Sequence, residues 1–199
     1  MSNAPLSSVD QAPSSIRSQR GHDVPRIVIT SPSDDPDLFA GYCEGLVARY
    51  TEIGAGHLVS ASRVPSRETP QTLVLLMTGH DVVGGVRFQQ GADLAEQTGI
   101  DALVEPIAAR APDGINEVKG VWLDPRFGGR GLAALMLQAL VDFTARFPER
   151  WLLGFSNPRS LAPALKVGFA PDPRFENLPY PTPEMRSTVI WLDHHARMI

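Results

Sequence analysis

A bare, cationic turn between an apolar strand and a long amphipathic helix constrains this chain more than any other feature. The segment NEVKGVWLDPRFGGRGLAALMLQALVDFTARF runs from Asn116 to Phe147, and three glycines and two arginines follow the apolar run that ends at Leu123. A helix N-terminus leaves backbone N–H groups without acceptors and carries partial positive charge. Glycines let a ligand approach these amides, and arginines add charge-assisted donors. The turn is therefore typical of a phosphate or pyrophosphate site.

Strand and helix patterns alternate along the rest of the chain. Short β-branched and apolar runs predict strands, and apolar residues at helical spacing predict helices. The predicted strands cover 25–30, 72–77, 82–88, 117–123, 150–157 and 187–193, and the predicted helices cover 31–50, 131–147 and 159–169. A short helix within 90–115 and a proline-dense loop over 170–186 complete the prediction. This order indicates an α/β or α+β sheet.

Length and composition restrict the class of protein. The 199 residues predict a disordered leader over 1–24, rich in Ser, Pro, Gln and Ala, and a single domain over 25–199. A net charge of −4 gives no argument for nucleic acid or for an anionic membrane as a partner. No apolar run approaches the roughly 20 residues of a membrane-spanning helix. The one cysteine, Cys43, excludes an intramolecular disulfide and fits a reducing cytoplasm, where we expect the protein to lie.

The glycine turn also allows a second interpretation. The letters GRGLAA (Gly129–Ala134) fit the G-x-G-x-x-A fingerprint of dinucleotide-binding domains. That fingerprint requires the glycines directly after the first strand of the domain, whereas Asp124–Phe127 intervene here and little chain follows. A nucleotide-binding oxidoreductase is therefore the weaker hypothesis.

Two motifs at one spacing resemble the GNAT superfamily of N-acetyltransferases. The pattern R-x-x-G-x-G at Arg126–Gly131, after V-x-L-x-P at Val121–Pro125, resembles motif A of that family. Asn157, a short helix and then Gly168-Phe169 resemble motif B. The resemblance covers about Val82–Phe169, and the flanking elements follow in the order of the family.

The resemblance implies a mixed, mostly antiparallel central sheet with helices on both faces and a splayed, V-shaped acyl-CoA cleft. The strand Val121–Leu123 would hold the pantetheine arm, and an amide near Val121 or Trp122 would polarise the thioester carbonyl. Amides from Phe127 to Leu132 would hold the pyrophosphate, and Asn157 would contact acetyl-CoA or cap the next helix. The implied residues for binding acetyl-CoA are Val121, Trp122, Leu123, Arg126, Phe127, Gly128, Gly129, Arg130, Gly131, Leu132 and Asn157.

The sequence offers several candidates for the catalytic residues. In many family members a Tyr four residues before the motif B glycine protonates the leaving thiolate, and Ala164 stands there in this chain. We predict Tyr180 as the acid, with Ser156, Ser160, water or the incoming amine as alternatives, and Glu117 as the base. Alternation along the strand predicts that Glu117, Lys119, Val121 and Leu123 share one face.

The acceptor is expected between the loops over 90–115 and 170–186, where carboxylates could recognise a cationic amine. These carboxylates are Asp93, Glu96, Asp101, Glu105, Asp172 and Glu176. Ala164 and Gly84-Gly85 would leave room for a longer acyl group. Trp122 and Trp191 would pack or pair across a homodimer, and His194-His195 are predicted to be a polar tail without metal.

The sequence thus predicts an acetyl-CoA-dependent N-acetyltransferase. It would act on a primary amine of a small molecule or peptide by direct attack in a ternary complex. The alternative is a non-catalytic acyl-CoA-binding or regulatory relative, because Ala164 stands where the usual acid is.

Overall fold

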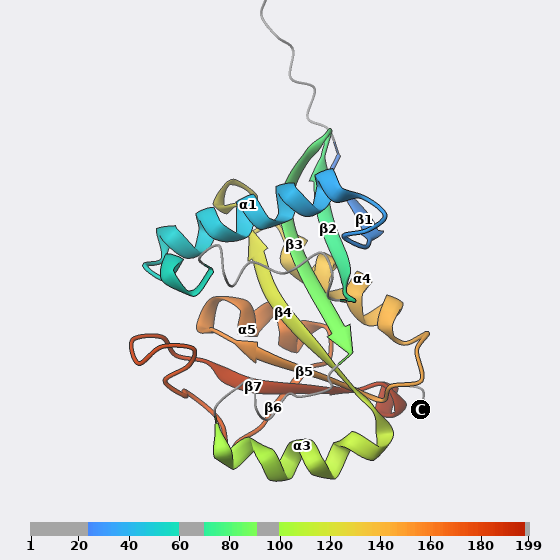
Figure 1. Cartoon of the computed structure of the whole chain (residues 1–199), viewed down its shortest axis with the longest axis vertical. Helices are drawn as coiled ribbons and strands as arrows, with labels where there is room; N and C mark the ends of the chain where they lie inside the picture. The colour runs from blue at the N-terminus through green and yellow to red at the C-terminus, as the bar shows by residue number, and fades with distance from the viewer. Residues whose placement is uncertain (1–23, 60–69, 91–99, 198–199) are drawn as a thin grey trace, which may run out of the picture.

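The computed structural model describes residues 24–59, 70–90 and 100–197, which build one sheet with helices on both faces (Figure 1). Neighbouring strands are antiparallel except β4 and β5, which run parallel. The sheet is therefore mixed and mostly antiparallel, as predicted. In the spatial order β1-β2-β3-β4-β5-β7-β6, its strands are β1 (Arg26–Thr30), β2 (Thr72–Thr78), β3 (Asp81–Gln90), β4 (Ile115–Leu123), β5 (Trp151–Ser156), β7 (Thr188–Asp193) and β6 (Ala170–Pro171).

The sheet topology excludes the dinucleotide-binding hypothesis. Dinucleotide-binding domains are built on an open sheet that is mostly parallel, with the glycine turn after its first strand. Here only one pair of neighbouring strands is parallel, and the glycine turn follows the fourth strand in sequence. The interpretation of Gly129–Ala134 as a dinucleotide fingerprint is therefore wrong.

Four α-helices lie within the described residues: α1 (Pro36–Glu52), α3 (Val104–Arg110), α4 (Leu132–Thr144) and α5 (Pro158–Lys166). The carboxylate of Asp35 caps α1 by accepting a hydrogen bond from the Leu38 amide at 3.0 Å. The structure ends α4 at Thr144, before the predicted end at Phe147. Phe147 nevertheless packs on Phe143, with ring centroids 5.3 Å apart, so its apolar side chain misled the helix prediction.

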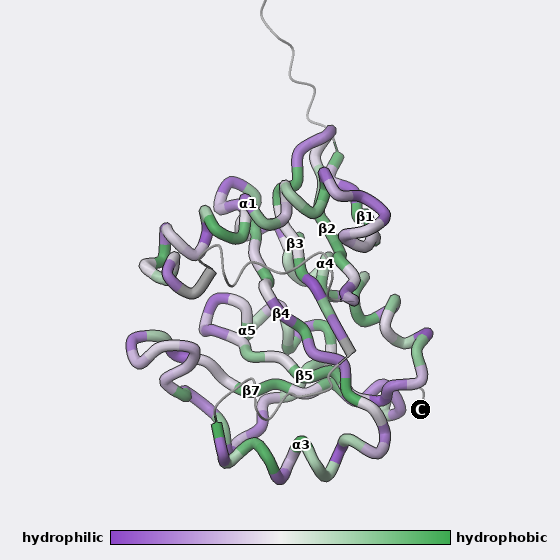
Figure 2. The backbone as a smooth tube through the Cα atoms, in the orientation of Figure 1, coloured by the Kyte–Doolittle hydropathy of each residue, from purple (hydrophilic) through white to green (hydrophobic). Residues whose placement is uncertain are grey.

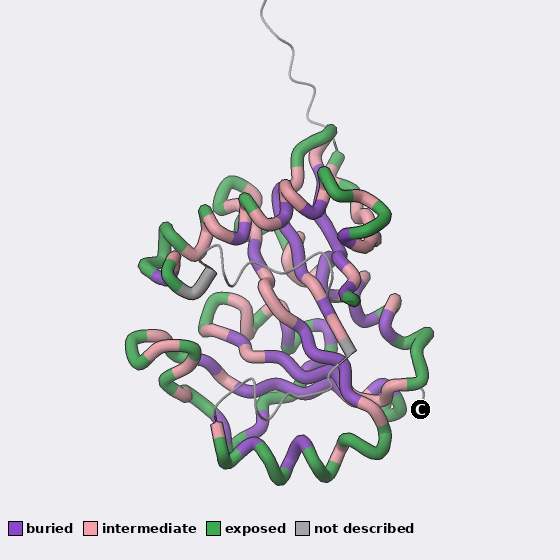
Figure 3. Tube along the Cα trace, viewed as in Figure 1, coloured by how far each residue is buried: buried purple, intermediate pink, exposed green. Residues whose placement is uncertain are grey.

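Buried residues lie along the strands of the sheet (Figure 3), and many of them are hydrophobic (Figure 2). The hydrophobic core that they form has a different organisation on each face of the sheet. One continuous cluster fills the space under α4 and α5. On the opposite face, one cluster lies under α1 and a separate cluster packs beside α3. Trp122 belongs to the first of these two clusters and Trp191 to the second, and both are buried, so neither offers a contact between chains.

A β-bulge interrupts β4 at Gly120. Trp122 pairs with Gly85 and Lys119 with Arg87, so two residues of β4 oppose one residue of β3. Gly120 has φ +59°, a left-handed conformation that favours glycine. The buried Tyr42 of α1 donates its hydroxyl to the Gly120 carbonyl oxygen at 2.8 Å. The bulge is thus held by a side chain from the covering helix.

The bulge shifts the alternation of side chains along β4 by one residue. Val118 belongs to the cluster under α4, so Glu117 and Lys119 face the α1 side, whereas Val121 and Leu123 beyond the bulge pack on the α4 side. The prediction that Glu117, Lys119, Val121 and Leu123 share one face is therefore wrong.

The sheet splays between β4 and β5. The two strands pair only between Ile115–Val118 and Trp151–Gly154. Beyond this point, the edge of β4 that faces β5 has no strand partner among the described residues. The backbone polar groups of Lys119–Leu123 on that edge can therefore bind a ligand.

The end of the described chain also differs from its prediction. His194 is buried, and its Nε2 lies 3.2 Å from the Thr144 hydroxyl at the end of α4. The polar-tail interpretation of this residue is wrong, because the chain turns back onto α4 after β7 ends at Asp193.

Candidate functional site

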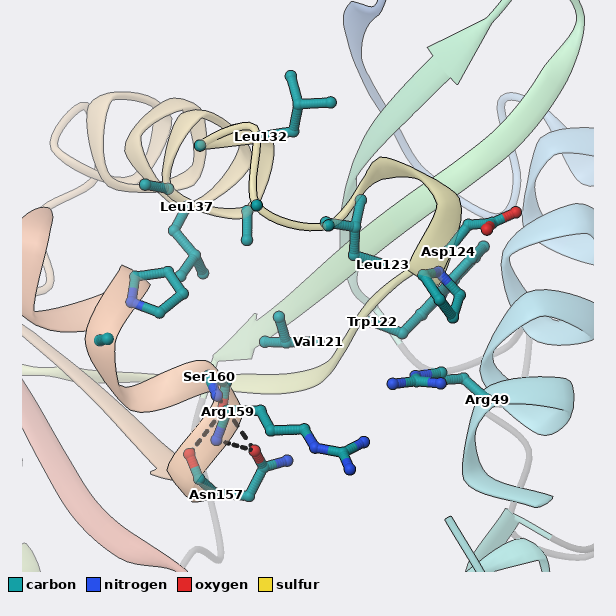
Figure 4. A pocket seen from close by; sticks show the side chains of 18 of the residues that line it. Arg49, Val121, Trp122, Leu123, Asp124, Leu132, Leu137, Asn157, Arg159 and Ser160 are labelled. Carbon is teal, nitrogen blue, oxygen red and sulfur yellow. Dashed lines mark hydrogen bonds between the residues drawn. The ribbon is translucent and has the colours of Figure 1, made fainter. Parts of the chain in front are cut away.

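Two cavities meet at the part of β4 that lies beyond the bulge. The Gly-loop cavity, about 400 Å³, lies between the glycine turn, the N-terminal part of α4, α5 and the end of α1 (Figure 4). The Glu117 cavity, about 320 Å³, is lined by Glu117 and its neighbours on the α1 side of the sheet and by the loop before β7. Both volumes are within the range of small-molecule sites. Four residues line both cavities: Tyr50, Val121, Asn157 and Ser160.

The glycine turn presents free amides to the first cavity. Gly129 and Gly131 have φ of +73° and +75°, and an added Cβ at either position would meet no heavy atom within 4 Å. The first intrahelical bond of α4 runs from the Leu135 amide to the Gly131 carbonyl. The amides that precede Leu135 in the first turn of α4 therefore remain available to an anion.

The free amides of the glycine turn begin later in the chain than Phe127, the first residue of the predicted pyrophosphate site. The amides of Phe127 and Gly128 already donate to the carbonyls of Asp124 and Pro125 within a 3₁₀ turn. They are therefore not available to a ligand, and the free amides begin at Gly129. Phe127 does not line the Gly-loop cavity, whereas Gly128 does.

The two arginines of the turn do not line the Gly-loop cavity. Arg126 is exposed and makes a two-point ion pair with Asp124, two residues earlier. It faces another cavity, between α1 and the β2–β3 turn. The Arg130 guanidinium lies 5.8 Å from the centre of the Phe127 ring. The predicted role of both arginines at the pyrophosphate stays a prediction, which their placement does not favour.

Three other cations line the Gly-loop cavity instead. They are Arg49 near the end of α1, Arg159 in the first turn of α5 and Lys166 at the end of α5. Figure 4 shows Arg159 and Arg49 extending toward one another from opposite sides of this cavity. Sequence reasoning missed these residues, since each lies outside the glycine motif and reaches the cavity only through the fold.

Asn157 acts as the N-cap of α5. Its Oδ1 accepts hydrogen bonds from the amides of Arg159 at 2.9 Å and Ser160 at 3.1 Å. The Ser160 hydroxyl lies 2.8 Å from the Ser156 hydroxyl. Because Asn157 also lines both cavities, the cap fixes the α5 terminus at the place where the cavities meet.

The predicted base and acid line the same cavity. Glu117 is buried, and its Oε2 lies 2.6 Å from Lys119 Nζ. Burial raises the pKa of the Glu117 carboxyl, although Lys119 and then Arg87 act in the opposite direction. Tyr180 stacks on Phe155 with ring centroids 4.4 Å apart, and burial followed by the Glu117 charge raises its pKa. The Tyr180 hydroxyl is therefore a proton donor at neutral pH.

Tyr50 is a further candidate acid that the sequence analysis did not consider. It lines both cavities, and burial raises its pKa above the ordinary value of tyrosine. In the sequence it reads only as an apolar position of α1.

The room that was expected beside Ala164 and Gly84-Gly85 for a longer acyl group is small at these positions. Ala164 is buried, and the space beside it at the apex of the splay is only about 20 Å³. A Cβ at Gly85 would lie 2.5 Å from the Tyr42 ring, and one at Gly84 would lie 3.0 Å from Leu123. These glycines accommodate neighbouring side chains rather than a ligand.

The loop carboxylates do not line the Glu117 cavity. Asp172 is buried and paired with Arg174 at 2.9 Å, while Asp101, Glu105 and Glu176 are exposed elsewhere. The placement of these four residues does not favour the expectation that they recognise a cationic acceptor, which stays a prediction. Asp93 and Glu96 lie outside the described residues.

The described ranges contain neither a membrane-spanning helix nor a cluster of metal ligands. None of the helices there combines the length and the hydropathy that a membrane crossing requires. No group of three or more His, Cys, Asp or Glu side chains there could hold a metal ion.

Relatives in sequence are distant. No protein-family profile matches the chain. An uncharacterized protein of Mycobacterium tuberculosis is 26% identical over 183 residues, which cover 86% of this chain and 70% of that protein.

The fold has clear counterparts among solved structures. FeeM, an N-acyl amino acid synthase from uncultured soil microbes, matches with a TM-score of 0.64 at 15% identity, over 88% of this chain and 98% of that chain. AAC(6')-Ib, in complex with paromomycin and acetyl-CoA, matches with a TM-score of 0.58 at 17% identity, over 88% of this chain and 97% of that chain. This chain therefore has the GNAT fold, as the resemblance of its two motifs predicted.

Proposed function

We propose that the protein is an acyl-CoA-dependent N-acyltransferase that transfers an acetyl group from acetyl-CoA to a primary amine. One observation carries the proposal: the two cavities meet at the unpaired edge of β4, one with free helix amides and the other with a buried carboxylate. A donor in the first cavity and an acceptor in the second would meet beside Val121. The similar structures of an N-acyl amino acid synthase and of an enzyme bound to acetyl-CoA support this proposal.

The Gly-loop cavity fits the chemistry of acyl-CoA, which supplies an acyl thioester when bound. The amides that begin at Gly129 would bind the pyrophosphate, and Arg159 and Lys166 would add charge-assisted donors to phosphate oxygens. The unpaired edge of β4 would hold the amide groups of the pantetheine arm as a neighbouring strand would. The protein would encounter acyl-CoA in the cytoplasm. A chain with a single cysteine suits this reducing compartment, because it needs no disulfide.

In the reaction, the amine nitrogen would attack the acyl carbon directly, and the bond from that carbon to sulfur would break. Glu117 would take the proton that the amine loses, and Tyr180 would give a proton to the leaving thiolate. The raised pKa of Glu117 makes it a stronger base than an ordinary carboxylate, and the raised pKa of Tyr180 keeps its proton available for donation. Much of the rate would come from holding amine and thioester side by side.

The small space at the apex of the splay supports acetyl as the transferred group. A longer chain would have to displace the packed side chains around Ala164. We therefore expect activity to decrease as the acyl chain of the donor becomes longer.

Calorimetric titration with acetyl-CoA tests the donor site. Arg159→Ala and Lys166→Ala should each weaken binding by roughly 10-fold to 150-fold, as for the loss of one charge-assisted hydrogen bond. Arg126→Ala is the matched control, because Arg126 lies outside the cavity, and it should bind as the wild type does. Equal losses in all three variants, or no binding of any acyl-CoA to the wild type, would reject the site.

The second candidate function is a non-catalytic acyl-CoA-binding protein. Ala164 favours it, because this buried position carries no proton donor. Release of free CoA, followed with a thiol reagent during incubation with acetyl-CoA and an amine library, separates the two. Binding without amine-dependent release would favour the second candidate.

A further inference from the structure

The floor of the Glu117 cavity carries two cations side by side. Arg87 of β3 and Lys119 of β4 are direct cross-strand partners on the α1 side of the sheet. Like charges placed directly opposite each other destabilise a sheet. The pair therefore has a cost to the fold that requires an explanation.

Only one of the two cations has a carboxylate partner. Lys119 pairs with Glu117 at 2.6 Å, and Glu117 is the only acidic residue among the described residues that line this cavity. Arg87 makes no ion pair within the described ranges. Its Nη1 donates to the neutral amide oxygens of Gln71 at 3.1 Å and Gln89 at 3.3 Å.

Arg87 also lies close enough to Tyr42 for a hydrogen bond with its hydroxyl, and one of its other donors has no partner within the described ranges. The Nε atom is buried and has no hydrogen-bond partner among the described residues. A guanidinium is a rigid fork that matches a planar carboxylate at two points, and leaving a partly buried charge unpaired is costly. Arg87 thus presents an unused recognition group for an anion inside the cavity.

We infer that the acceptor is an amino acid, whose amine lies near Glu117 and whose carboxylate binds Arg87. This inference rests on the proposed function, and it names the chemical class of the acceptor. Glu117 and Arg87 lie on adjacent strands, two residues apart in register, so one small molecule can contact both. Within the described residues, the cavity offers a polyamine only one carboxylate, whereas a zwitterion finds both signs of charge.

The test compares each amino acid with the amine that remains after its carboxylate is removed, with acetyl-CoA as donor. Wild-type kcat/KM should favour the amino acid by roughly 10-fold to 100-fold, the range for a charge-assisted contact. Arg87→Gln should remove this preference by lowering kcat/KM for the amino acid alone. Arg87→Lys, which keeps the charge but loses the fork, should fall between them.

Two measurements show whether a lower kcat/KM reflects weaker acceptor binding, weaker donor binding or loss of folding. The affinity for acetyl-CoA should be the same in the wild type, Arg87→Gln and the control Arg146→Gln, whose side chain is exposed at the end of α4 and outside both cavities. The thermal midpoint of each variant shows whether it folds. Weaker acetyl-CoA binding in Arg87→Gln alone would overturn the inference, because Arg87 would then serve the donor.

A binding measurement at equilibrium distinguishes failure of the inference from failure of the proposed reaction. N-acetyl amino acids and N-acetyl amines are titrated into the protein with CoA, which requires no turnover. Tighter binding of the acids, lost in Arg87→Gln, supports the carboxylate site even where no transfer is detected. Equal binding of acids and amines overturns it, whatever the outcome for transfer.

Discussion

The hydrogen bond from Tyr42 to the bulge gives a prediction with a calculable size. Tyr42 is fully buried, and its hydroxyl donates to the Gly120 carbonyl at 2.8 Å. Burial raises the pKa of this hydroxyl, so it remains a donor at all ordinary pH values. Tyr42→Phe removes the donor and leaves the carbonyl without this partner in the core. Loss of one partner of a buried hydrogen bond costs about 1–3 kcal/mol.

That cost is measurable. For a chain of this size, 1 kcal/mol corresponds to roughly 2–4 °C in Tm, so Tyr42→Phe should lower Tm by about 2–12 °C. Denaturant unfolding should show the same loss with an unchanged slope. Tyr50→Phe is the matched control, since the Tyr50 hydroxyl makes no hydrogen bond among the described residues, and its Tm should stay close to that of the wild type.

The same substitution tests whether the bulge matters for catalysis. Gly120 precedes Val121, where the two cavities meet, so a loosened bulge should misplace the reacting groups. Small misplacements can cost on the order of 100-fold in rate. We expect kcat to decrease by about 10-fold to 100-fold while the affinity for acetyl-CoA changes little. Wild-type stability together with wild-type kcat in Tyr42→Phe would refute the reasoning that the hydroxyl holds the bulge.

Further predictions concern three single side chains. The raised pKa of Glu117 predicts that kcat/KM increases as the pH rises through that pKa, above 4.5, and Glu117→Gln should remove this dependence and lower kcat by about 10²–10⁴-fold. Because the buried carboxylate is disfavoured in the folded state, wild-type stability should decrease relative to Glu117→Gln over the same rise in pH, as pH-dependent denaturation would show. Asn157→Ala removes the cap of α5 and should cost about 0.5–2 kcal/mol in denaturant unfolding, with a wild-type value counting against the cap. Hydrogen bonds from Arg150 lower the Asp193 pKa from 3.8 to about 2, so the stability advantage of the wild type over Asp193→Asn should be complete above pH 5 and lost as the pH falls from 4 toward 2.

The sequence predicts the elements of this fold better than their exact geometry. Apolar runs and helical spacing identify the strands and helices because burial on one or both faces imposes those periods on the chain. The sequence pattern places the two residues of β6 in a loop, since two residues carry no period. The bulge at Gly120 was missed, although a glycine inside a strand is a known signal for one. This single glycine changed which residues share a face with Glu117.

In the candidate site too, some features can be predicted from the sequence and others cannot. The glycine turn was recognisable because left-handed backbone and free amides at a helix start depend on neighbouring residues. The roles of cations depend on distant parts of the chain. Arg126 pairs with Asp124 two residues away, a local competitor that motif matching ignores. Arg87 acquires its importance only when β3 pairs with β4 and places it opposite Lys119.

Because β4 pairs with β5 over a short stretch, the two halves of the sheet are connected by few backbone hydrogen bonds. Four residue pairs and the core under α4 connect the half that contains β1–β4 to the half that contains β5, β7 and β6. On the opposite face, the cluster under α1 belongs to the first half, and the cluster beside α3 adds one more contact by packing Ile115 of β4 against β5 and β7. A donor seated in the gap would act as a clamp, and its binding energy would add to the stability of the folded chain. The supply of donor in the cell would then also set how often the halves part and how long the chain resists proteolysis.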